Sequence, residues 1–312
     1  MAVAFVAQAF TIGLTIIPFG LFATPMVEEF GLSIASVQVG LGLFIVVLTG
    51  TSAGIGPLLD RYSIRLFMAL GSILMALCFW GMSLAHHPWQ LALLFSGGAA
   101  LGVSLAGPLA ATTVIAKWFD EKRGLAVGIA AMGPPAGGLL LTPLAGWLLA
   151  EFGWRETLQV FAAIALLLAP LAWLVVKSTP EEVGQTVDGL ASVDPVAKAP
   201  ASSVPLNLRK IIRSRNFWSL ALAMGIVFGI GGGWNANAPR FGEDLGYSGQ
   251  YMSSLIGIAA GLGIPSTLLF GLLADRFDNR RLLWWAIGGQ ALAFLLLWTQ
   301  SPGIVFTGAI LL

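Results

Sequence analysis

Two segments of the chain place an aspartate and two arginines in the same order beside an apolar run. They contain Gly56, Asp60, Arg61 and Arg65 in the first segment, and Gly271, Asp275, Arg276 and Arg280 in the second. An aspartate at the end of a membrane helix needs a cation or the positive N-terminus of another helix as its partner. These residues therefore indicate ion pairing between helix ends, and their recurrence in register predicts two duplicated halves.

A second set of residues with binding chemistry lies inside apolar runs, away from their ends. They are Gln8, Thr11 and Thr15 in the first run, and Trp234, Asn235 and Asn237 in the seventh. The three residues of the first run are spaced so that they share one face of a helix. Amides, hydroxyls and an aromatic ring at membrane depth are groups that can bind a small solute.

Three consecutive glycines, Gly231–Gly233, come directly before Trp234 in the seventh run. We expect them to weaken the helix and to free backbone groups, which membrane proteins tolerate where the backbone faces protein or a wet cavity. Two alternatives stay open. Trp234 is also typical of a membrane interface, and the two asparagines are also suited to capping a broken helix.

The residue types that enzymes and metal sites require are scarce. The two histidines, His86 and His87, adjoin Pro88 in a predicted turn, and the single cysteine, Cys78, lies within an apolar run. The sequence contains no nucleophile elbow, no metal-ligand spacing and no phosphate-binding loop. We therefore predict no enzymatic activity, no metal and no other cofactor.

The composition indicates what surrounds these residues. Hydrophobic residues make up 57% of the chain and charged residues 10%, and the mean hydropathy is +0.87. An ordinary soluble domain carries about 25% charged residues. The apolar runs also reach the length of about 20 residues that a helix needs to cross a bilayer. The predicted fold class is therefore all-α, a polytopic bundle of membrane helices.

Charged and turn-forming residues divide the sequence into nine predicted spans. Their ranges are 4–27, 33–59, 66–85, 89–116, 124–150, 157–176, 216–239, 251–274 and 282–299. The organisation predicted is an N-terminal six-helix half (1–176), a central loop (177–215) and an incomplete C-terminal half (216–312). Residues 303–312 are apolar but too few to cross a bilayer, which predicts a six-plus-six plan cut short after about nine and a half spans.

The basic residues predict the orientation in the membrane. Of the 16 lysines and arginines, 14 fall after the second, fourth, sixth and eighth spans, whereas Arg155 and Arg240 lie on the other side. By the positive-inside rule the first side is cytoplasmic, and so are the N-terminus and the central loop. We expect an integral, multi-pass protein of a bacterial plasma membrane.

The repeated aspartate–arginine segments resemble the loop signature of the major facilitator superfamily, G-x-L-x-D-R-x-G-R-[RK]. Both copies depart from it, because Ser63 and Asp278 replace the second glycine, and Ile64 and Asn279 replace a basic residue. In that family the cluster joins the two halves on the cytoplasmic side while the transporter faces outward. The resemblance implies that both segments belong to a cytoplasmic gate, and ordinary charges that flank membrane helices are the alternative.

The fifth predicted span carries a second element, formed by Gly133, Pro134, Gly137 and Gly138. It resembles the G-P-x-x-G-G element of antiporters in the same superfamily. Proline removes a backbone donor and kinks a helix, and glycine permits close helix contact, so the resemblance implies a hinge. The block 117–124 further resembles the oxalate:formate antiporter and monocarboxylate porter branch.

The resemblance implies a secondary active transporter that moves a small solute by alternating access. The branch favours an organic anion, a mono- or dicarboxylate; a multidrug or metabolite efflux antiporter and a transporter-like solute sensor are the alternatives. The implied partners are the lipid bilayer and a small-molecule substrate with a coupled proton or counter-solute, and the protein is expected to be a monomer that binds no nucleic acid. No charged residue lies clearly inside a span, so the sequence offers no proton-coupling group.

Overall fold

The computed structural model describes residues 1–120, 123–184, 187, 213–274 and 278–298, and these residues form helices and connecting turns without a β-strand. Within this described part of the chain, eight helices, or runs of consecutive helices, are long and apolar enough to cross a membrane. Another apolar helix, Arg281–Leu296, is shorter. The predicted fold class, an all-α polytopic membrane bundle, is confirmed.

Helices α1 to α10 form the first six spans, which we call the N-terminal bundle, and α12 to α14 are the C-terminal helices. The elements are α1 Ala2–Thr15, η1 Pro18–Phe22, α2 Ala23–Phe30, α3 Ile34–Arg61, α4 Ile64–Ser83, α5 Pro88–Ala92, the π-helix η2 Leu93–Ala99, α6 Ala100–Ala106, α7 Pro108–Trp118, α8 Arg123–Ala131, α9 Gly133–Phe152, α10 Trp154–Val175, η3 Pro180–Val183, α12 Arg215–Asp244, α13 Gly249–Ala274 and α14 Asn279–Trp298. Most of the predicted central loop and the tail 303–312 lie outside the described residues.

Three spans consist of consecutive helices that meet close to a proline. The first span changes to the 3-10 helix η1 at Pro18, and the fourth span resumes at Pro108 after Gly107. The fifth span is divided at Met132, with Pro134 in the first turn of α9. Proline lacks the N–H that would continue the helical hydrogen bonds, so each proline begins a new helix.

The predicted interruption of the seventh span is wrong. Helix α12 runs from Arg215 to Asp244 without a break, through Gly231–Gly233 and through Pro239. A continuous helix satisfies its own backbone groups, and in lipid this requirement outweighs the low helix propensity of glycine. The first span is also longer than predicted, because α2 continues past Glu28 and ends at Gly31, which has a φ of 63°.

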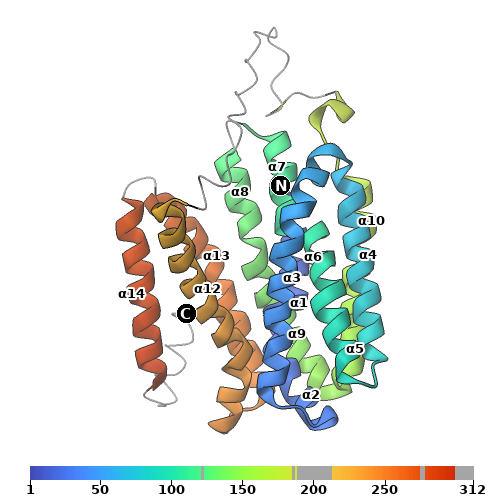
Figure 1. Ribbon diagram of the computed structural model, residues 1–312, viewed down its shortest axis with the longest axis vertical. Coiled ribbons are helices and arrows are strands. Elements are labelled where there is room, and N and C mark those ends of the chain that lie inside the picture. Colours follow the sequence, from blue (N-terminus) through green and yellow to red (C-terminus); the bar gives the residue numbers. More distant parts are fainter. Residues whose placement is uncertain (121–122, 185–186, 188–212, 275–277, 299–312) are drawn as a thin grey trace.

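Successive spans alternate in direction, so their ends fall on two sides of the molecule (Figure 1). We call one side the basic end; it carries the turns near residues 62, 120 and 278 and the segment that follows Val176. The opposite end carries the turns at Gly31, at residues 84–87, at Gly153 and at Gly246. The turns that the sequence assigned to one side therefore lie together.

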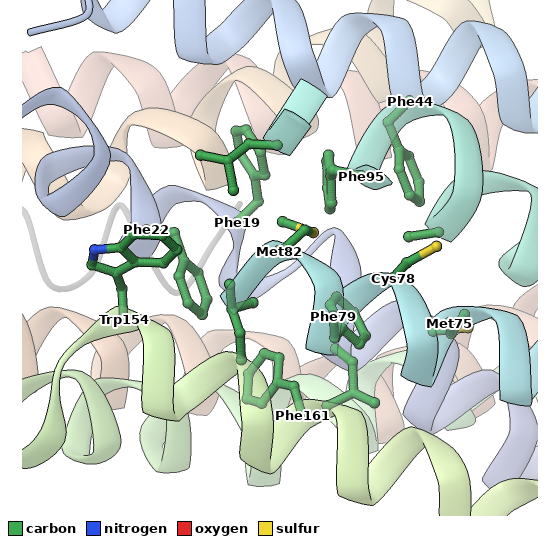
Figure 2. Packing of buried hydrophobic residues seen from close by; sticks show 14 of the residues in the cluster. Phe19, Phe22, Phe44, Met75, Cys78, Phe79, Met82, Phe95, Trp154 and Phe161 are labelled. Carbon is green, nitrogen blue, oxygen red and sulfur yellow. The ribbon is translucent and has the colours of Figure 1, made fainter. Parts of the chain in front are cut away.

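Aromatic side chains fill the centre of the N-terminal bundle (Figure 2). Phe44, Phe79 and Phe161 come from three different helices and are fully buried. Helix α4 packs along α10, and α1 packs along α9. By contrast, large apolar residues such as Leu174 and Phe228 are exposed on the outside, as expected where lipid is the solvent.

Helix α13 packs along α9 and joins the C-terminal helices to the bundle. The contact extends from Gly146, beside Ser253 near the opposite end, to Pro135, beside Gly263. Toward the basic end, a Cβ atom added at Gly128 of α8 would meet no atom of the described residues within 4 Å. Among the described residues, the C-terminal helices lie closer to the N-terminal bundle at the opposite end than toward the basic end (Figure 1).

Candidate functional site

A cavity of about 280 Å³, which we call the central cavity, lies between the N-terminal bundle and the C-terminal helices. It is lined by Ile17, Pro134, Pro135, Gly231, Trp234, Asn235, Ile256, Ala259, Ala260 and Gly263. The lining is mostly apolar and carries no charged side chain. The indole of Trp234 and the amide of Asn235 are its hydrogen-bonding side chains. This position and this chemistry suit a small solute held between two groups of helices.

The helical twist of α12 turns the residues predicted in the seventh span to different faces. Trp234 and Asn235 line the central cavity, and the ring of Trp234 packs edge-on against Phe241, with 5.9 Å between the ring centroids. Asn237 lies on another face of α12, because residues two apart on a helix do not face the same way. Its Nδ2 donates to the backbone oxygen of Gly233 at 2.7 Å.

The side chain of Asn237 instead contacts the N-terminal bundle. Gln38 of α3 donates from Nε2 to Oδ1 of Asn237 at 3.0 Å. Nearer the end of α12, the hydroxyl of Thr24 donates to Oε2 of Glu243 at 3.1 Å. We call these two hydrogen bonds the opposite-end contacts, because they join the bundle to α12 on the side of the central cavity away from the basic end.

Gly20 explains how α12 approaches the bundle so closely. A Cβ atom at this position would lie 2.6 Å from the backbone oxygen of Asn235 and 2.8 Å from that of Ala236. Only a residue without a side chain lets the η1 backbone pack directly on α12 at this point. The sequence analysis does not predict a role for Gly20. Its position directly after Pro18-Phe19 is the sequence feature that could have indicated one.

The residues of the predicted fifth-span hinge face two neighbours. Gly133 and Gly137 pack against α1, where an added Cβ would clash with the backbone of Phe5 and Ala9, respectively. Gly138 faces α13 instead, and Pro134 lines the central cavity. The element therefore lies between the first span, the C-terminal helices and the central cavity, which is where a hinge would act.

The polar residues predicted on α1 do not reach the central cavity. Gln8, Thr11 and Thr15 are all buried. The hydroxyl of Thr11 donates to the backbone oxygen of Ala7 at 2.7 Å, and that of Thr15 donates to the oxygen of Thr11 at 2.5 Å. Both hydroxyls are therefore used within the helix. The structure does not bring these three residues together with Trp234 and Asn235.

The first copy of the predicted gate lies at the basic end of α3. Asp60 and Arg61 are exposed, and their side chains form no ion pair with the described residues. The guanidinium of Arg65 lies 4.9 Å from the ring centroid of Trp173. Lys117 donates from Nζ to the backbone oxygens of Leu59 at 3.0 Å and Asp60 at 3.3 Å, so a cation caps the negative end of α3. Gly56 lies within α3, one position before Pro57.

The second copy of the gate cannot be compared with the first. Asp275 and Arg276 lie outside the described residues, and the side-chain surroundings of Arg280 and the packing of Gly271 are also outside them. The role of all eight gate residues stays a prediction.

A polar cluster at the opposite end was missed by the sequence analysis. Arg155 donates from Nη1 to Oε1 of Glu29 at 2.6 Å and from Nη2 to the backbone oxygen of Ala85 at 2.8 Å. The indole N–H of Trp154 donates to Oε2 of Glu29 at 2.6 Å. The cluster links α2, α10 and the turn after α4. Arg155 is isolated on the side with few basic residues, and this isolation is the sequence feature that could have indicated the cluster.

Comparison with known proteins gives a family and several relatives. A family model described as Major Facilitator Superfamily matches residues 3–312. The uncharacterized MFS-type transporter YcxA of Bacillus subtilis is 27% identical over 172 residues, which cover 54% of this chain and 42% of that protein. Monocarboxylate transporter 11 of Mus musculus is 30% identical over 285 residues, which cover 88% of this chain and 58% of that protein. The chain thus spans about half the length of these relatives.

The fold also matches solved structures. A bacterial homolog of the human lysosomal transporter Spinster, in an inward-facing and unoccupied conformation, has a TM-score of 0.76 to this chain at 22% sequence identity. The match covers 99% of this chain and 70% of that one. At this identity the likeness concerns the fold alone.

Proposed function

The chain belongs to the Major Facilitator Superfamily, and we propose that this multi-pass membrane protein is a secondary active transporter that moves a small solute by alternating access. The N-terminal bundle (α1 to α10) and the C-terminal helices (α12 to α14) are the two parts that move against each other. The solute binds in the central cavity between them.

The observation that carries this proposal is the unequal contact on the two sides of the central cavity. On the opposite end, the hydrogen bonds from Gln38 to Asn237 and from Thr24 to Glu243 join the bundle to α12. Toward the basic end, α13 contacts α8 far less than it contacts α9, and a Cβ atom at Gly128 of α8 would meet nothing within 4 Å among the described residues. A site that is closed on one side and open on the other is what alternating access requires. With the basic end assigned to the cytoplasm, this conformation faces inward.

Switching to the outward-facing conformation requires the two ends to exchange roles. The opposite-end contacts separate, and the basic end closes around the segment that contains Asp60 and Arg61. The exposure of both side chains, without an ion pair among the described residues, supports a disengaged gate in the present conformation. The divided fifth span, with Gly133 and Gly138 facing two neighbours, supplies the bend.

The substrate class we favour is a small carboxylate. The name of the relative monocarboxylate transporter 11 and the resemblance of the block 117–124 both support it. Trp234 and Asn235 provide donors for carboxylate oxygens. Because the lining has no charged side chain, the negative charge needs compensation, and a proton that accompanies the carboxylate would supply it.

A second candidate is efflux of an apolar compound. It is favoured by one observation, the predominance of apolar lining residues such as Ile17, Pro135 and Ile256. The two candidates differ in the solute that binds in the central cavity. Assays with carboxylates and with apolar dyes on one protein preparation therefore distinguish them.

Transport by the natural full-length protein in liposomes tests the proposal. Vesicles loaded with unlabelled lactate, succinate or another small carboxylate should accumulate the same labelled carboxylate by counterflow, and an inward proton gradient should increase uptake. Extrusion of an apolar dye without carboxylate counterflow would favour the second candidate. Absence of both activities across a broad panel of solutes would contradict a transport function.

Variants of α12 connect the activity to the central cavity. Asn235→Leu should weaken carboxylate binding by about tenfold to a hundredfold, because a hydrogen bond to a charged group contributes about 1.5–3 kcal/mol. The matched control is Asn216→Leu at the exposed start of the same helix, which should leave transport unchanged. Equal effects of the two substitutions would place the substrate elsewhere.

A further inference from the structure

A second cavity lies inside the N-terminal bundle near the opposite end, with a volume of about 230 Å³. Residues of α1, η1, α2, α3, α4, α5, η2 and α10 line it. None of them lines the central cavity. We call it the bundle cavity, and the transport mechanism proposed above does not use it.

The bundle cavity is built from aromatic and sulfur-containing side chains. Its walls include Phe19, Phe22, Phe79, Met82 and Phe95, all of them buried. Figure 2 shows these residues from close by, with the rings of Phe19 and Phe95 on one side and those of Phe22 and Phe79 near Met82. Aromatic rings and methionine adapt well to an apolar ligand.

The two hydroxyl groups of the lining already have partners. The hydroxyl of Thr15 donates to the oxygen of Thr11 at 2.5 Å, and the hydroxyl of Ser36 lies 2.9 Å from that of Ser33. The backbone oxygen of Gly40 accepts a hydrogen bond from Ser96 at 2.8 Å. A buried water needs two to four polar partners, and an apolar cavity of about 150 Å³ can stay dry and bind benzene. The bundle cavity therefore suits a compact apolar molecule better than water.

The mouth of the bundle cavity lies between α3 and α5. Ser36 and Ala92 are exposed at its rim, and the side chain of Trp89 is 63% exposed. Trp89 follows the turn at residues 84–87, which marks the opposite end of the span. Tryptophan prefers the boundary between membrane and water, so the mouth lies where molecules dissolved in the bilayer reach the protein surface.

One wall of the bundle cavity is the same segment that contacts α12. Phe19 stacks on Phe95 with 5.2 Å between ring centroids, and Phe95 stacks on Phe44 at 4.7 Å. Phe19 belongs to the 3-10 helix η1 and Phe95 to the π-helix η2, two irregular forms that often mark functional positions. Gly20, the next residue after Phe19, packs on the backbone oxygen of Asn235. A molecule against Phe19 would therefore support the segment that meets α12.

We propose that the bundle cavity binds a compact apolar molecule about the size of an alkylbenzene, which enters from the bilayer, and that its binding stabilises the contact between η1 and α12. Binding itself is independent of transport. The regulatory consequence rests on the proposed function: a bound molecule favours the conformation that is closed at the opposite end, and so slows the switch to the outward-facing one.

Photolabelling tests the binding site. The full-length protein in liposomes is illuminated with trifluoromethyl phenyl diazirine, and labelled residues are identified by mass spectrometry. Phe79, which is only 1% exposed, and Met82 should be labelled, and excess toluene should remove that label. Leu77 on the same helix is 64% exposed and reports labelling from lipid, which toluene should not reduce at the same concentration. Labelling of Leu77 without Phe79 or Met82 would overturn the proposal.

Two leucine substitutions in α3 provide a matched pair. Gly40 lines the bundle cavity, and a Cβ atom there meets nothing within 4 Å among the described residues, so Gly40→Leu should fill the space. Gly42 has the same freedom but does not line the cavity. Gly40→Leu should reduce the label on Phe79 and Met82 to background, whereas Gly42→Leu should not. Equal labelling of both variants would contradict the assignment.

Disulfide formation tests the regulatory consequence. In a Cys78→Ala background, cysteines replace Gln38 and Asn237 at one of the opposite-end contacts. Toluene should raise the rate of cross-linking by about fivefold or more, the range typical of coupled sites, and Gly40→Leu should abolish this increase. An unchanged rate alongside specific labelling would overturn the coupling. Specific labelling of a protein that transports nothing would support the binding site and contradict the proposed function instead.

Discussion

Gln38 of α3 donates a hydrogen bond from Nε2 to Oδ1 of Asn237 of α12 over 3.0 Å, and approaches the backbone oxygen of Ala236 at 3.4 Å. The two residues are 199 positions apart in sequence. They connect the N-terminal bundle to the C-terminal helices on the side that is closed in this conformation. The pair is therefore a direct means of changing the balance between the two conformations.

Gln38→Leu should shift the population toward the conformation that is open at the opposite end. A net hydrogen bond contributes about 1 kcal/mol, which corresponds to a change of about fivefold in an equilibrium. Spin labels at Ala35 and Gly249, both exposed, should report a longer distance component in the variant. Gln159→Leu in α10 is the control, because Gln159 makes no hydrogen bond with the described residues. A shift of the same size in the control would show that the effect does not depend on the contact of Gln38 with Asn237.

The contact between α9 and α13 leaves no room for a side chain at Gly138. A Cβ atom there would lie 2.5 Å from Cβ of Ala260 and 2.9 Å from Cδ1 of Ile17. Gly138→Val should lower the free energy of unfolding by about 1–3 kcal/mol, the usual effect of overpacking. Gly128→Val in the same span is the control, since open space surrounds Gly128 among the described residues. Thermal unfolding in nanodiscs should separate the two variants, and equal midpoints would contradict the close packing seen at this contact.

The membrane spans could be predicted because their signal is local. A run of apolar residues of sufficient length has few alternatives to a membrane helix. Local chemistry also explains why α7 begins at Pro108, because proline cannot continue the helical hydrogen bonds of the preceding turn. The family was also within reach, because Asp60 and Arg61 belong to a recurring segment whose spacing can be compared directly.

The arrangement of the candidate site could not be predicted in the same way. The sequence predicts Asn235 and Asn237 as one group on a broken helix, but α12 is continuous and turns them to different faces. Likewise, Thr11 and Thr15 share a helix face, yet their hydroxyls bond to the backbone of their own helix. The pairing of Pro134 with Trp234 in one cavity depends on how α9 and α12 pack, and no local sequence pattern records it.

Thr142 offers a substitution that should stabilise the protein. Its hydroxyl is buried in α9 and has no hydrogen-bond partner among the described residues. An unsatisfied buried polar group costs about 1–3 kcal/mol, so Thr142→Val, which keeps the shape, should raise the free energy of unfolding by a comparable amount. Thr11→Val is the matched control, because the buried hydroxyl of Thr11 donates to Ala7 and its removal gains nothing. A lower unfolding temperature for Thr142→Val would show that the hydroxyl has a partner.

The cluster around Arg155 should stabilise the opposite end of the N-terminal bundle more than an ordinary surface ion pair does. Arg155 binds Glu29 at 2.6 Å and also Ala85, and Glu29 accepts a further hydrogen bond from Trp154, so each group is positioned by more than one partner. Both charged side chains are partly exposed, and solvent weakens their attraction. Arg155→Gln should therefore lower the free energy of unfolding by about 1 kcal/mol, at the upper end for exposed pairs.

The control for this prediction is the pair of Arg240 with Asp244, which lies at the same end of the molecule. Its atoms are 3.7 Å apart and its side chains are more exposed. Arg240→Gln should change the free energy of unfolding by less than about 0.5 kcal/mol. Urea unfolding of both variants in nanodiscs, at low and high salt, measures the difference. Since screening acts mainly on exposed charges, salt should reduce the effect of Arg155→Gln only in part. If high salt removed the whole effect, Arg155 and Glu29 would form an ordinary surface pair, and the hydrogen bond from Arg155 to Ala85 would contribute nothing measurable.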